Sequence, residues 1–397
     1  MKKILIANRG EIAIRIARTC NDLGIKTIGI FSEDDLNSLH LSKMDESFMI
    51  DEKGANAYLN IKKIIDIAKR EKVDGIHPGY GFLSENPAFA KAAKQAKLKF
   101  IGPSEKSLII FGDKSEAKLL ATNLDIPVVK GTDGKTSLKL ASSFFKGLKK
   151  NSSLVIKAIA GGGGRGMRVV NSDSELKDAM NRASSEAKAA FDSSDLYVEE
   201  YLKNYRHVEV QVLGDGKGNA VHMHERECST QRRHQKIIEI SPAPGINKEL
   251  KQKMFNASVH LIKETKYEGL ATVEFLVDYS KGDFKFIECN ARLQVEHTVT
   301  EAVLGLDLVR AQIQIASGKS LKQLKLEQED IPEPKGFAVQ SRVNMEVIDS
   351  KGEIKPSGGK FTSFDLPSGP GVRSDSYGYN GYESNPAFDS LIAKVIT

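Results

Sequence analysis

Residues 153–170, SLVIKAIAGGGGRGMRVV, place four consecutive glycines between two short apolar runs. Such runs are typical of β-strands, and the first of them carries Lys157. A flexible linker is one explanation, because glycine adopts many backbone conformations. The other is a phosphate-covering hairpin, in which backbone N–H groups of Gly161–Gly164 approach an anion that Lys157 neutralises. A linker rarely lies inside a tight strand–loop–strand, which favours the phosphate loop.

The composition is that of a globular protein larger than one ordinary domain. The chain has 397 residues, of which 40% are hydrophobic and 28% charged, and its formal net charge is +6. Its lysines are scattered and it has no tryptophan, so we expect small anionic substrates and no nucleic acid. No apolar run approaches the roughly 18 residues that span a bilayer, so no membrane association is expected. Three widely spaced cysteines, Cys20, Cys228 and Cys289, favour a reducing, cytoplasmic setting over disulfides or a zinc cluster.

The order of the predicted elements divides the chain into modules. Strand and helix patterns alternate through residues 1–112, which predicts a doubly wound parallel sheet. Residues 130–202 form a smaller αβ unit with the glycine hairpin, and residues 203–317 contain longer strands typical of an antiparallel sheet. An acidic, proline-bearing connector precedes more strands in residues 336–397. The final apolar strand, SLIAKVIT, has no successor to pair with, so we expect this sequence to be a piece of a longer protein.

Residues 287–297, IECNARLQVEH, are expected to form one β-strand whose side chains alternate between two faces. The core face would hold Ile287, Cys289, Ala291, Leu293 and Val295, and the polar face Glu288, Asn290, Arg292, Gln294 and Glu296. A solvent-exposed sheet face would give the same alternation. The order of chemical types favours a site instead. Glu288 and Asn290 are oxygen donors suited to Mg²⁺, and Glu274, in an apolar strand, is a second carboxylate that needs a partner.

The second half of that polar face suits a small anion. Arg292 offers a planar fork of donors, Gln294 adds another donor, and Glu296 is a candidate base. One strand would then carry metal ligands at one end and an anion site with a base at the other. This order predicts transfer of the γ-phosphate of ATP to a small oxyanion.

Two further stretches carry candidate phosphate contacts. Residues 225–239, ERECSTQRRHQKIIE, place Gln231, His234 and Lys236 in a polar, cationic run, which an exposed basic loop would also explain. Lys114 opens a predicted helix and could reach phosphates, although an ordinary surface lysine would look the same.

Taken together, these motifs resemble the biotin carboxylase family of the ATP-grasp superfamily, from Met1 to Thr397. The stretches that carry the resemblance are ANRGEIAIRI, HPGYGFLSEN, GDK, KAIAGGGGRGM, ERECSTQRRHQK, VEF, FIECNARLQVEHTVTE and, less closely, AVQSRVN. The resemblance implies a mixed α/β and α+β architecture, the ATP-grasp fold. Its parts would be an N-terminal domain at 1–112, an ATP-grasp domain at 113–317 with a glycine-loop lid at 130–202, a connector at 318–335 and a mainly antiparallel, incomplete C-terminal domain at 336–397.

The resemblance also implies a role for individual residues. ATP contacts would come from Lys114, Lys157, Gly161, Gly162, Gly163, Gly164, Glu199, Leu202, His207, Gln231 and His234. Two Mg²⁺ or Mn²⁺ ions would be held by Glu274 and Glu288, with Asn290 a third ligand in some members. Bicarbonate would lie among Lys236, Arg292, Gln294 and the backbone of Val295, with Glu296 as its base. Arg342 would stabilise the biotin enolate, and Tyr80 and Arg342 would lie near the ureido ring.

The implied activity is that of a ligase that carboxylates carrier-bound biotin with ATP and bicarbonate through carboxyphosphate. The implied partners are a biotin carboxyl carrier, a carboxyltransferase and a second copy of the chain or a larger complex. No stretch resembles the biotin-acceptor motif AMKM, so the carrier would be a partner or a further domain. Residues 337–347, FAVQSRVNMEV, look closer to biotin carboxylase regions of large multidomain carboxylases than to separate bacterial subunits. Another ATP-grasp carboxylate ligase, such as a carbamoyl-phosphate synthase-like enzyme, and a non-catalytic nucleotide-binding module are the alternatives.

Overall fold

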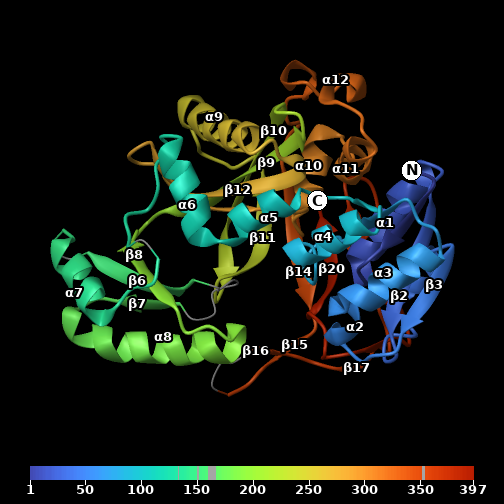
Figure 1. Ribbon diagram of the computed structural model, residues 1–397, viewed down its shortest axis with the longest axis horizontal. Coiled ribbons are helices and arrows are strands. Elements are labelled where there is room, and N and C mark those ends of the chain that lie inside the picture. The colour runs from blue at the N-terminus through green and yellow to red at the C-terminus, as the bar shows by residue number, and fades with distance from the viewer. Residues whose placement is uncertain (133, 150–151, 160–166, 351–353) are drawn as a thin grey trace.

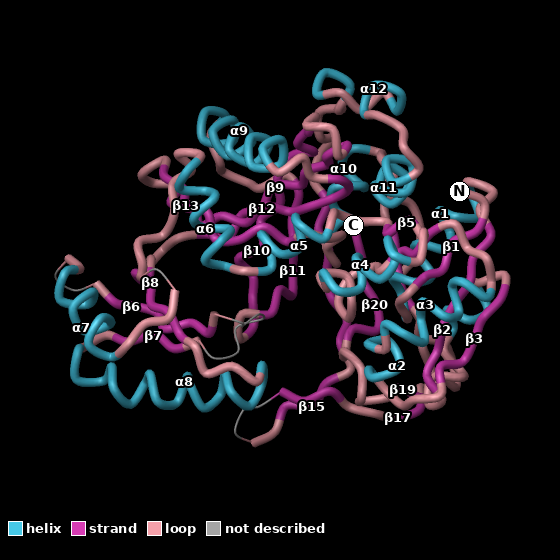
Figure 2. Tube along the Cα trace, viewed as in Figure 1, coloured by secondary structure: helices cyan, strands magenta, loops and turns pink. Residues whose placement is uncertain are grey.

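A computed structural model of the protein describes residues 1–132, 134–149, 152–159, 167–350 and 354–397. The predicted glycine loop, Gly161–Gly164, lies outside these residues. Figure 1 shows three parts, with the N-terminal sheet on the right, a small lid on the lower left and a large sheet between them. Figure 2 shows that each part mixes helices and strands, in agreement with the predicted mixed α/β class.

The N-terminal part is a five-stranded parallel sheet in the order β3-β2-β1-β4-β5. Its strands are β1 (Lys3–Ile6), β2 (Lys26–Ser32), β3 (Glu46–Ile50), β4 (Gly75–His77) and β5 (Lys99–Phe100), and its helices are α1 (Gly10–Asp22), α2 (Ala55–Leu59), α3 (Ile61–Arg70) and α4 (Pro87–Gln95). Alternation along β1 sends Ile4 and Ile6 into one core with α1, and Leu5 into another with α3 and α4. This confirms the predicted doubly wound sheet.

The strand order reverses between β1 and β4, and ligands in such sheets bind where it reverses, beyond the carboxyl ends of the strands. Asn8 follows β1, and its side-chain Nδ2 donates to the carbonyls of Pro78 (2.7 Å) and Tyr80 (2.8 Å) after β4. Gly79 between them has φ +65°, and a Cβ there would lie 2.7 Å from the Asn8 amide. Only glycine fits this close approach, which holds Tyr80 at the switch point.

The lid is a three-stranded antiparallel sheet in the order β7-β6-β8, with two helices packed on it (Figure 1). Its elements are α7 (Leu138–Gly147), β6 (Ser153–Ala158), β7 (Arg168–Val170), α8 (Leu176–Phe191) and β8 (Leu196–Tyr201). Leu154, Ile156 and Val198 belong to a core that the lid does not share with the other parts. The apolar runs on either side of the glycines are therefore paired strands, as the sequence predicts.

The central part is an eight-stranded antiparallel sheet in the order β13-β12-β9-β10-β11-β14-β20-β18. Its strands are β9 (Arg206–Asp215), β10 (Ala220–Arg232), β11 (Gln235–Ser241), β12 (Glu268–Asp278), β13 (Asp283–Asn290), β14 (Ala338–Asn344), β18 (Arg373–Ser376) and β20 (Leu391–Ile396). β11 pairs with β14, so the sheet continues across the connector expected at 318–335. Two small two-stranded antiparallel sheets, β15 (Glu346–Ile348) with β16 (Ile354–Pro356) and β17 (Gly359–Lys360) with β19 (Glu383–Ser384), lie outside it.

Further helices cover this sheet and the N-terminal part. They are α5 (Glu105–Gly112), α6 (Lys114–Asn123), α9 (Lys248–Glu264), α10 (His297–Leu304), α11 (Leu308–Ala316) and α12 (Leu321–Leu324). Among the described residues, no helix is long and apolar enough to cross a lipid bilayer.

The predicted single strand over residues 287–297 is wrong in two respects. First, Ile287 is unpaired in a bulge between the pairs Glu274–Glu288 and Phe275–Phe286, and it lines a cavity instead of the core. Second, β13 ends at Asn290, residues 291–296 form a loop, and Glu296 is the N-cap residue of α10. Alternation alone cannot reveal a bulge or the point where a strand gives way to a helix.

His77, buried at the end of β4, makes the fold sensitive to acid. The Gly79 N–H donates a hydrogen bond to His77 Nδ1 at 3.1 Å. Burial, together with the positive charge of Arg15, lowers the pKa of His77 to about 3. The unfolded state then binds the extra proton below pH 6.5, so folding stability decreases as the pH falls. The free energy of unfolding should fall between pH 7.5 and pH 5. In His77→Asn, which keeps an acceptor for Gly79, we expect this fall to be smaller by about 2 kcal/mol. Urea titrations of both proteins at pH 7.5 and pH 5 measure the free energy of unfolding. An equal fall in the two proteins would contradict a role of His77 in the acid sensitivity.

Candidate active site

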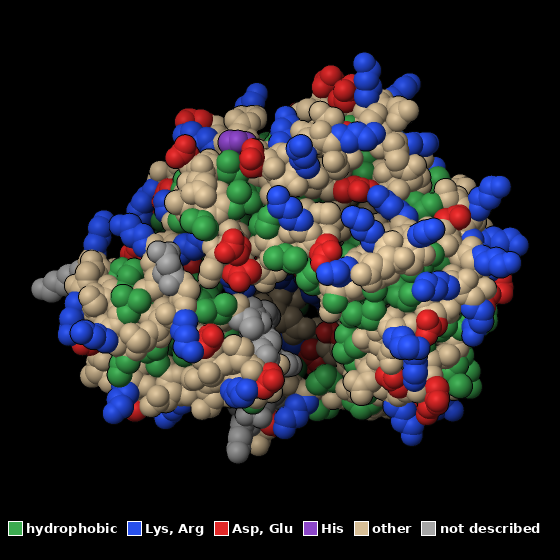
Figure 3. Space-filling view, viewed as in Figure 1, with side chains coloured by type: hydrophobic (Ala, Val, Ile, Leu, Met, Phe, Trp, Pro, Cys, Tyr) green, Lys and Arg blue, Asp and Glu red, His purple; other side chains and the backbone are tan. Residues whose placement is uncertain are grey.

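A cavity of about 870 Å³ lies where the three parts meet. Figure 3 shows this face of the molecule hollowed between the lid and the N-terminal part. All described residues that the sequence suggested for a site line the cavity: Tyr80, Lys114, Lys157, Glu199, Leu202, His207, Gln231, His234, Lys236, Glu274, Glu288, Asn290, Arg292, Gln294, Val295, Glu296 and Arg342.

Three carboxylates stand in a row across neighbouring strands of the sheet. Glu274 of β12 is directly opposite Glu209 of β9 on one side and Glu288 of β13 on the other. Like charges in directly opposed positions are destabilising unless cations lie between them. The row therefore marks a place where the fold collects positive charge.

Glu209 is neutralised from within the protein. The fully buried Arg226 donates from Nε to Glu209 Oε1 (2.5 Å), and Lys236 Nζ donates to Glu209 Oε2 (2.5 Å). The remaining N–H groups of Arg226 donate to Gln211, Thr272 and Thr300. Glu209 does not line the cavity, so it pairs with Lys236 on the side away from the cavity.

Glu274 and Glu288 face the cavity and fit a hard divalent cation. Asn290 adds a carbonyl oxygen to the same side, its Nδ2 donating to Glu274 Oε1 at 2.8 Å, and Lys114 Nζ lies 3.4 Å from Glu288 Oε2. One or two carboxylates plus substrate phosphates are the usual protein ligands of Mg²⁺. Ligand atoms of His207, Glu209 and Glu274 also lie within 4.8 Å of one another, but Glu209 does not line the cavity, whereas Glu274 and Glu288 both do. The donor set thus favours the Glu274–Glu288 pair.

Lys236 lies between Glu274, a candidate metal ligand, and Glu296, the candidate base. Its Nζ donates to Glu274 Oε1 (2.9 Å) and to Glu296 Oε1 (2.7 Å), besides Glu209. Burial works to lower the pKa of Lys236, but the three carboxylates outweigh burial and raise this pKa well above its ordinary value. Lys236 is therefore a fixed ammonium ion between the candidate metal ligands and the candidate base.

Glu296 is held by cations on two sides, because Lys236 contacts its Oε1 and Arg342 its Oε2. Arg342 NH2 donates to Glu296 Oε2 at 3.1 Å, and its Nε donates to Glu239 Oε1 at 2.7 Å. Burial would raise the pKa of Glu296, but Lys236, then Arg342 and Arg226, lower it below its ordinary value. Glu296 is thus a carboxylate at neutral pH and can accept a proton.

Arg292 is held in place by the N-terminal part. Its Nε donates to Glu85 Oε2 (2.7 Å), NH1 donates to Gln294 Oε1 (3.0 Å), and NH2 donates to Asn290 Oδ1 (3.3 Å). The loop after β13 therefore brings Arg292, Gln294 and Glu296 to one end of the cavity, although they do not share a strand.

Lys157, a candidate ATP contact, is paired with a carboxylate of the lid. Lys157 Nζ donates to Glu199 Oε2 (2.6 Å), and Lys118 Nζ donates to Glu199 Oε1 (3.1 Å). Burial would raise the pKa of Glu199, but Lys157 and Lys118 together lower it. Glu199 lies on β8 and Leu202 just beyond it, so this strand end forms one wall of the cavity.

Two histidines, His207 and His234, also line the cavity. His207 Nε2 is 2.8 Å from Glu274 Oε2, and His207 Nδ1 is 3.1 Å from Gln231 Nε2. Burial works to lower the pKa of His207, but Glu274 outweighs it and the pKa rises. Burial lowers the pKa of His234, which leaves that ring neutral at pH 7.

Sequence reasoning missed several residues that support the site. Glu209 could have been found, because His207, Glu209 and Gln211 alternate along β9 in the same way as the residues of β13. The sequence around three other residues gives little indication of a role in the site: Glu239, Arg226 and Lys118. Their roles follow from contacts with residues distant in sequence. Glu85 lies inside the motif HPGYGFLSEN, yet nothing local to it indicates a contact with Arg292.

Three family profiles match consecutive stretches of the chain. They are described as "Biotin carboxylase, N-terminal domain" for residues 1–108, "Carbamoyl-phosphate synthase L chain, ATP binding domain" for 113–324 and "Biotin carboxylase C-terminal domain" for 340–397. Because biotin carboxylase profiles match on both sides of the shared ATP-binding profile, the carbamoyl-phosphate synthase-like alternative is not favoured.

Similar proteins agree with these profiles. The chain is 46% identical to the pyruvate carboxylase of Staphylococcus aureus, aligning over all of this chain but only 34% of that protein, and so spans about a third of it. It is 42% identical to biotin carboxylase 1 of Bacillus subtilis, with 100% of this chain and 87% of that protein covered.

A solved structure shares the fold. It is the biotin carboxylase domain dimer of Hydrogenobacter thermophilus 2-oxoglutarate carboxylase, in complex with MgADP, ADP and bicarbonate. The TM-score is 0.94 at 41% identity, with 100% of this chain and 86% of that chain covered. Sequence, fold and cavity lead to one conclusion: the chain belongs to the biotin carboxylase family.

Proposed function

We propose that the protein is a ligase that carboxylates carrier-bound biotin, using ATP and bicarbonate, with carboxyphosphate as intermediate. One observation carries the proposal: the ammonium group of Lys236 contacts both Glu274, a candidate metal ligand, and Glu296, a candidate base. A phosphoryl donor bound at the first and an oxyanion bound at the second would therefore be adjacent. The MgADP and bicarbonate bound by the Hydrogenobacter domain support this pairing of ligands.

Bicarbonate would bind among Lys236, Arg292, Gln294 and the backbone of Val295. Its negative charge would draw the Lys236 ammonium away from Glu296, which raises the basicity of Glu296 at the moment a proton is to be taken. Glu296 then removes the bicarbonate proton, and the freed oxygen attacks the γ-phosphorus while ADP leaves. Fixed cations around the reacting oxygens supply the main stabilisation.

ATP would lie between the lid and β12–β13. We expect ATP contacts from Lys114, Lys157, His207, Gln231 and His234. The adenine ring would lie beside Glu199 and Leu202, and Gly161–Gly164 would contact the phosphates. Glu274 and Glu288, with Asn290, would hold one or two Mg²⁺ or Mn²⁺ ions, which neutralise phosphate charge. Closure of the lid would exclude water from the unstable carboxyphosphate.

Biotin would enter between Tyr80 and Arg342. Carboxyphosphate breaks down to CO₂ and phosphate, the phosphate takes the N1′ proton of biotin, and the Arg342 guanidinium stabilises the enolate that then attacks CO₂. We further propose a biotin carboxyl carrier and a carboxyltransferase as partners, a homodimer or larger complex, and a cytoplasmic location. The domain divisions 1–112, 113–317 with lid 130–202, 318–335 and 336–397 also stay a proposal.

The test is ATP hydrolysis by the protein with and without bicarbonate, and with free biotin added. We expect hydrolysis to require bicarbonate and to be stimulated by biotin, with label from bicarbonate recovered in carboxybiotin. Hydrolysis that is indifferent to bicarbonate would refute the proposal, because an ATPase or a non-catalytic nucleotide module does not need the site around Arg292 and Glu296.

A further inference from the structure

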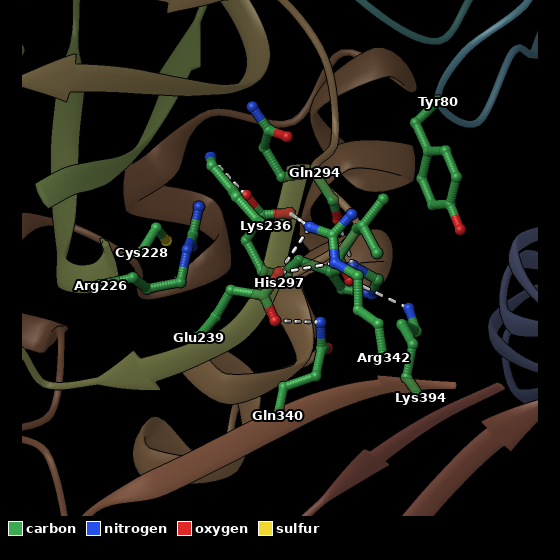
Figure 4. Close-up of polar contacts among 12 residues, drawn as sticks. Tyr80, Arg226, Cys228, Lys236, Glu239, Gln294, His297, Gln340, Arg342 and Lys394 are labelled. Carbon is green, nitrogen blue, oxygen red and sulfur yellow. Dashed lines mark hydrogen bonds and ion pairs between the residues drawn. The ribbon is translucent and has the colours of Figure 1, made fainter. Parts of the chain in front are cut away.

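Lys394 is a fully buried lysine that no step above uses. It lies on β20, directly opposite Arg342 of β14 on one side and Asp375 of β18 on the other, so the three side chains share one face of the sheet. Arg342 is neutralised by Glu239 and Glu296. Lys394 instead points toward the loop that leads from β13 to α10 (Figure 4).

The ammonium group of Lys394 binds the backbone next to the candidate base. Its Nζ donates to the carbonyl oxygen of Val295 at 3.0 Å. That carbonyl and the N–H of Glu296 belong to one planar peptide group, so holding the oxygen fixes the orientation of the backbone from which the Glu296 side chain leaves. His297 fixes the preceding peptide, with Nδ1 at 2.7 Å from the carbonyl oxygen of Gln294.

The counter-ion of Lys394 comes from the N-terminal part. Glu11, the second residue of α1, places Oε2 at 3.1 Å from Lys394 Nζ and accepts a hydrogen bond from the hydroxyl of Tyr80 through Oε1. Tyr80 is in turn held by Asn8. One buried ion pair therefore connects the loop of the base to the residue expected beside biotin.

Stability does not explain this arrangement. Buried ion pairs can often be replaced by apolar side chains of similar volume with no loss of stability, whereas removal of one partner alone is strongly destabilising. A buried lysine that pairs with Glu11 and also donates to the backbone carbonyl next to Glu296 is better explained by a requirement for accurate geometry.

We propose that Lys394 is a positioning residue that holds the Val295–Glu296 peptide, and with it the carboxylate of Glu296, in the orientation needed to deprotonate bicarbonate. The proposal rests on the proposed function only for what Glu296 does, since the contact itself is present in the protein without substrates. A displacement of reacting groups by about 1 Å can cost about 100-fold in rate, so the loss of this contact should be visible in kcat.

The decisive comparison is between Lys394→Met and the double variant Glu11→Gln/Lys394→Met. Both remove the donor to Val295, but the double variant also removes the unpaired buried carboxylate. We expect the double variant to recover thermal stability relative to the single one, while kcat for bicarbonate-dependent ATP hydrolysis stays at least about tenfold below that of the unmodified protein in both. The Kd for MgATP should stay within about twofold. Recovery of kcat together with stability would overturn the proposal, because Lys394 would then only balance charge.

Two further measurements complete the test. Lys360→Met, at an exposed lysine of β17, should leave kcat unchanged. Hydrogen–deuterium exchange of peptides covering residues 292–300 should be faster in the double variant than in the unmodified protein, and equal exchange would also overturn the proposal. This readout needs no turnover. If the unmodified protein shows no bicarbonate-dependent hydrolysis, the proposed function fails, while exchange still decides whether Lys394 holds the loop.

Discussion

Glu296→Gln is expected to lower kcat for bicarbonate-dependent ATP hydrolysis by about 10²- to 10⁴-fold, the range of general base catalysis. The amide keeps nearly the same shape, and its single oxygen can accept a hydrogen bond from one of the two cations that Glu296 contacts, Lys236 or Arg342, but it cannot take the proton of bicarbonate. The substitution leaves Lys157, a proposed ATP contact paired with Glu199, untouched. The Kd for MgATP should therefore change by less than about threefold, as measured by titration calorimetry.

Glu329→Gln serves as the control, because Glu329 is exposed in the segment between α12 and β14 and the same chemical change there should leave both constants unaltered. Lost nucleotide binding with preserved turnover in Glu296→Gln would contradict the role of Glu296 as base.

Arg342→Ser is expected to reduce carboxylation of free biotin by about 10²- to 10³-fold, the effect of removing one fixed donor to a developing oxyanion. ATP hydrolysis driven by bicarbonate without biotin should fall less, because Lys236 still contacts Glu296 at 2.7 Å. Transfer of labelled bicarbonate to biotin, measured beside phosphate release, separates the two activities.

Removal of Arg342 also leaves Glu239 and Glu296 without a shared cation, so Arg342→Lys is needed beside it to keep the charge while losing the planar donor fork. Arg182→Ser, on the exposed side of α8, controls for the loss of an arginine. Biotin carboxylation that survives intact in Arg342→Ser would remove the enolate role and favour another carboxylate ligase.

Much of the fold follows from periodicity. The alternation of strands and helices in residues 1–112 predicted a parallel sheet because parallel strands need crossover connections, and the structure confirms it. The apolar runs beside the glycines are strands for the same local reason. Glu274 in an apolar strand predicted a buried carboxylate that needs a partner, and in the structure Lys236 and His207 contact it at the wall of the cavity.

What the sequence could not provide are features decided by distant residues. The bulge at Ile287 depends on the pairing of β13 with β12, and β13 ends where this pairing ends, at Asn290 opposite Thr272. Lys394 is one lysine in an apolar run at the end of the sequence, with no local sign that its partners are Glu11 and Val295. Periodicity describes an element and its faces, whereas partners separated by hundreds of residues come only from the assembled fold.

The cations of the cavity each arrive with an acidic companion from the chain itself: Lys114 with Glu288, Lys157 with Glu199, Arg292 with Glu85, and Arg342 with Glu239. An anion that binds there would therefore exchange places with a carboxylate and release few dissolved ions. We expect anion affinity in such a cavity to vary little with ionic strength, unlike attraction to an exposed basic surface. A chloride ion, which is round and singly charged, cannot match the forked contacts that a carboxylate has to give up. The site would thus distinguish between anions by their shape more than by their charge.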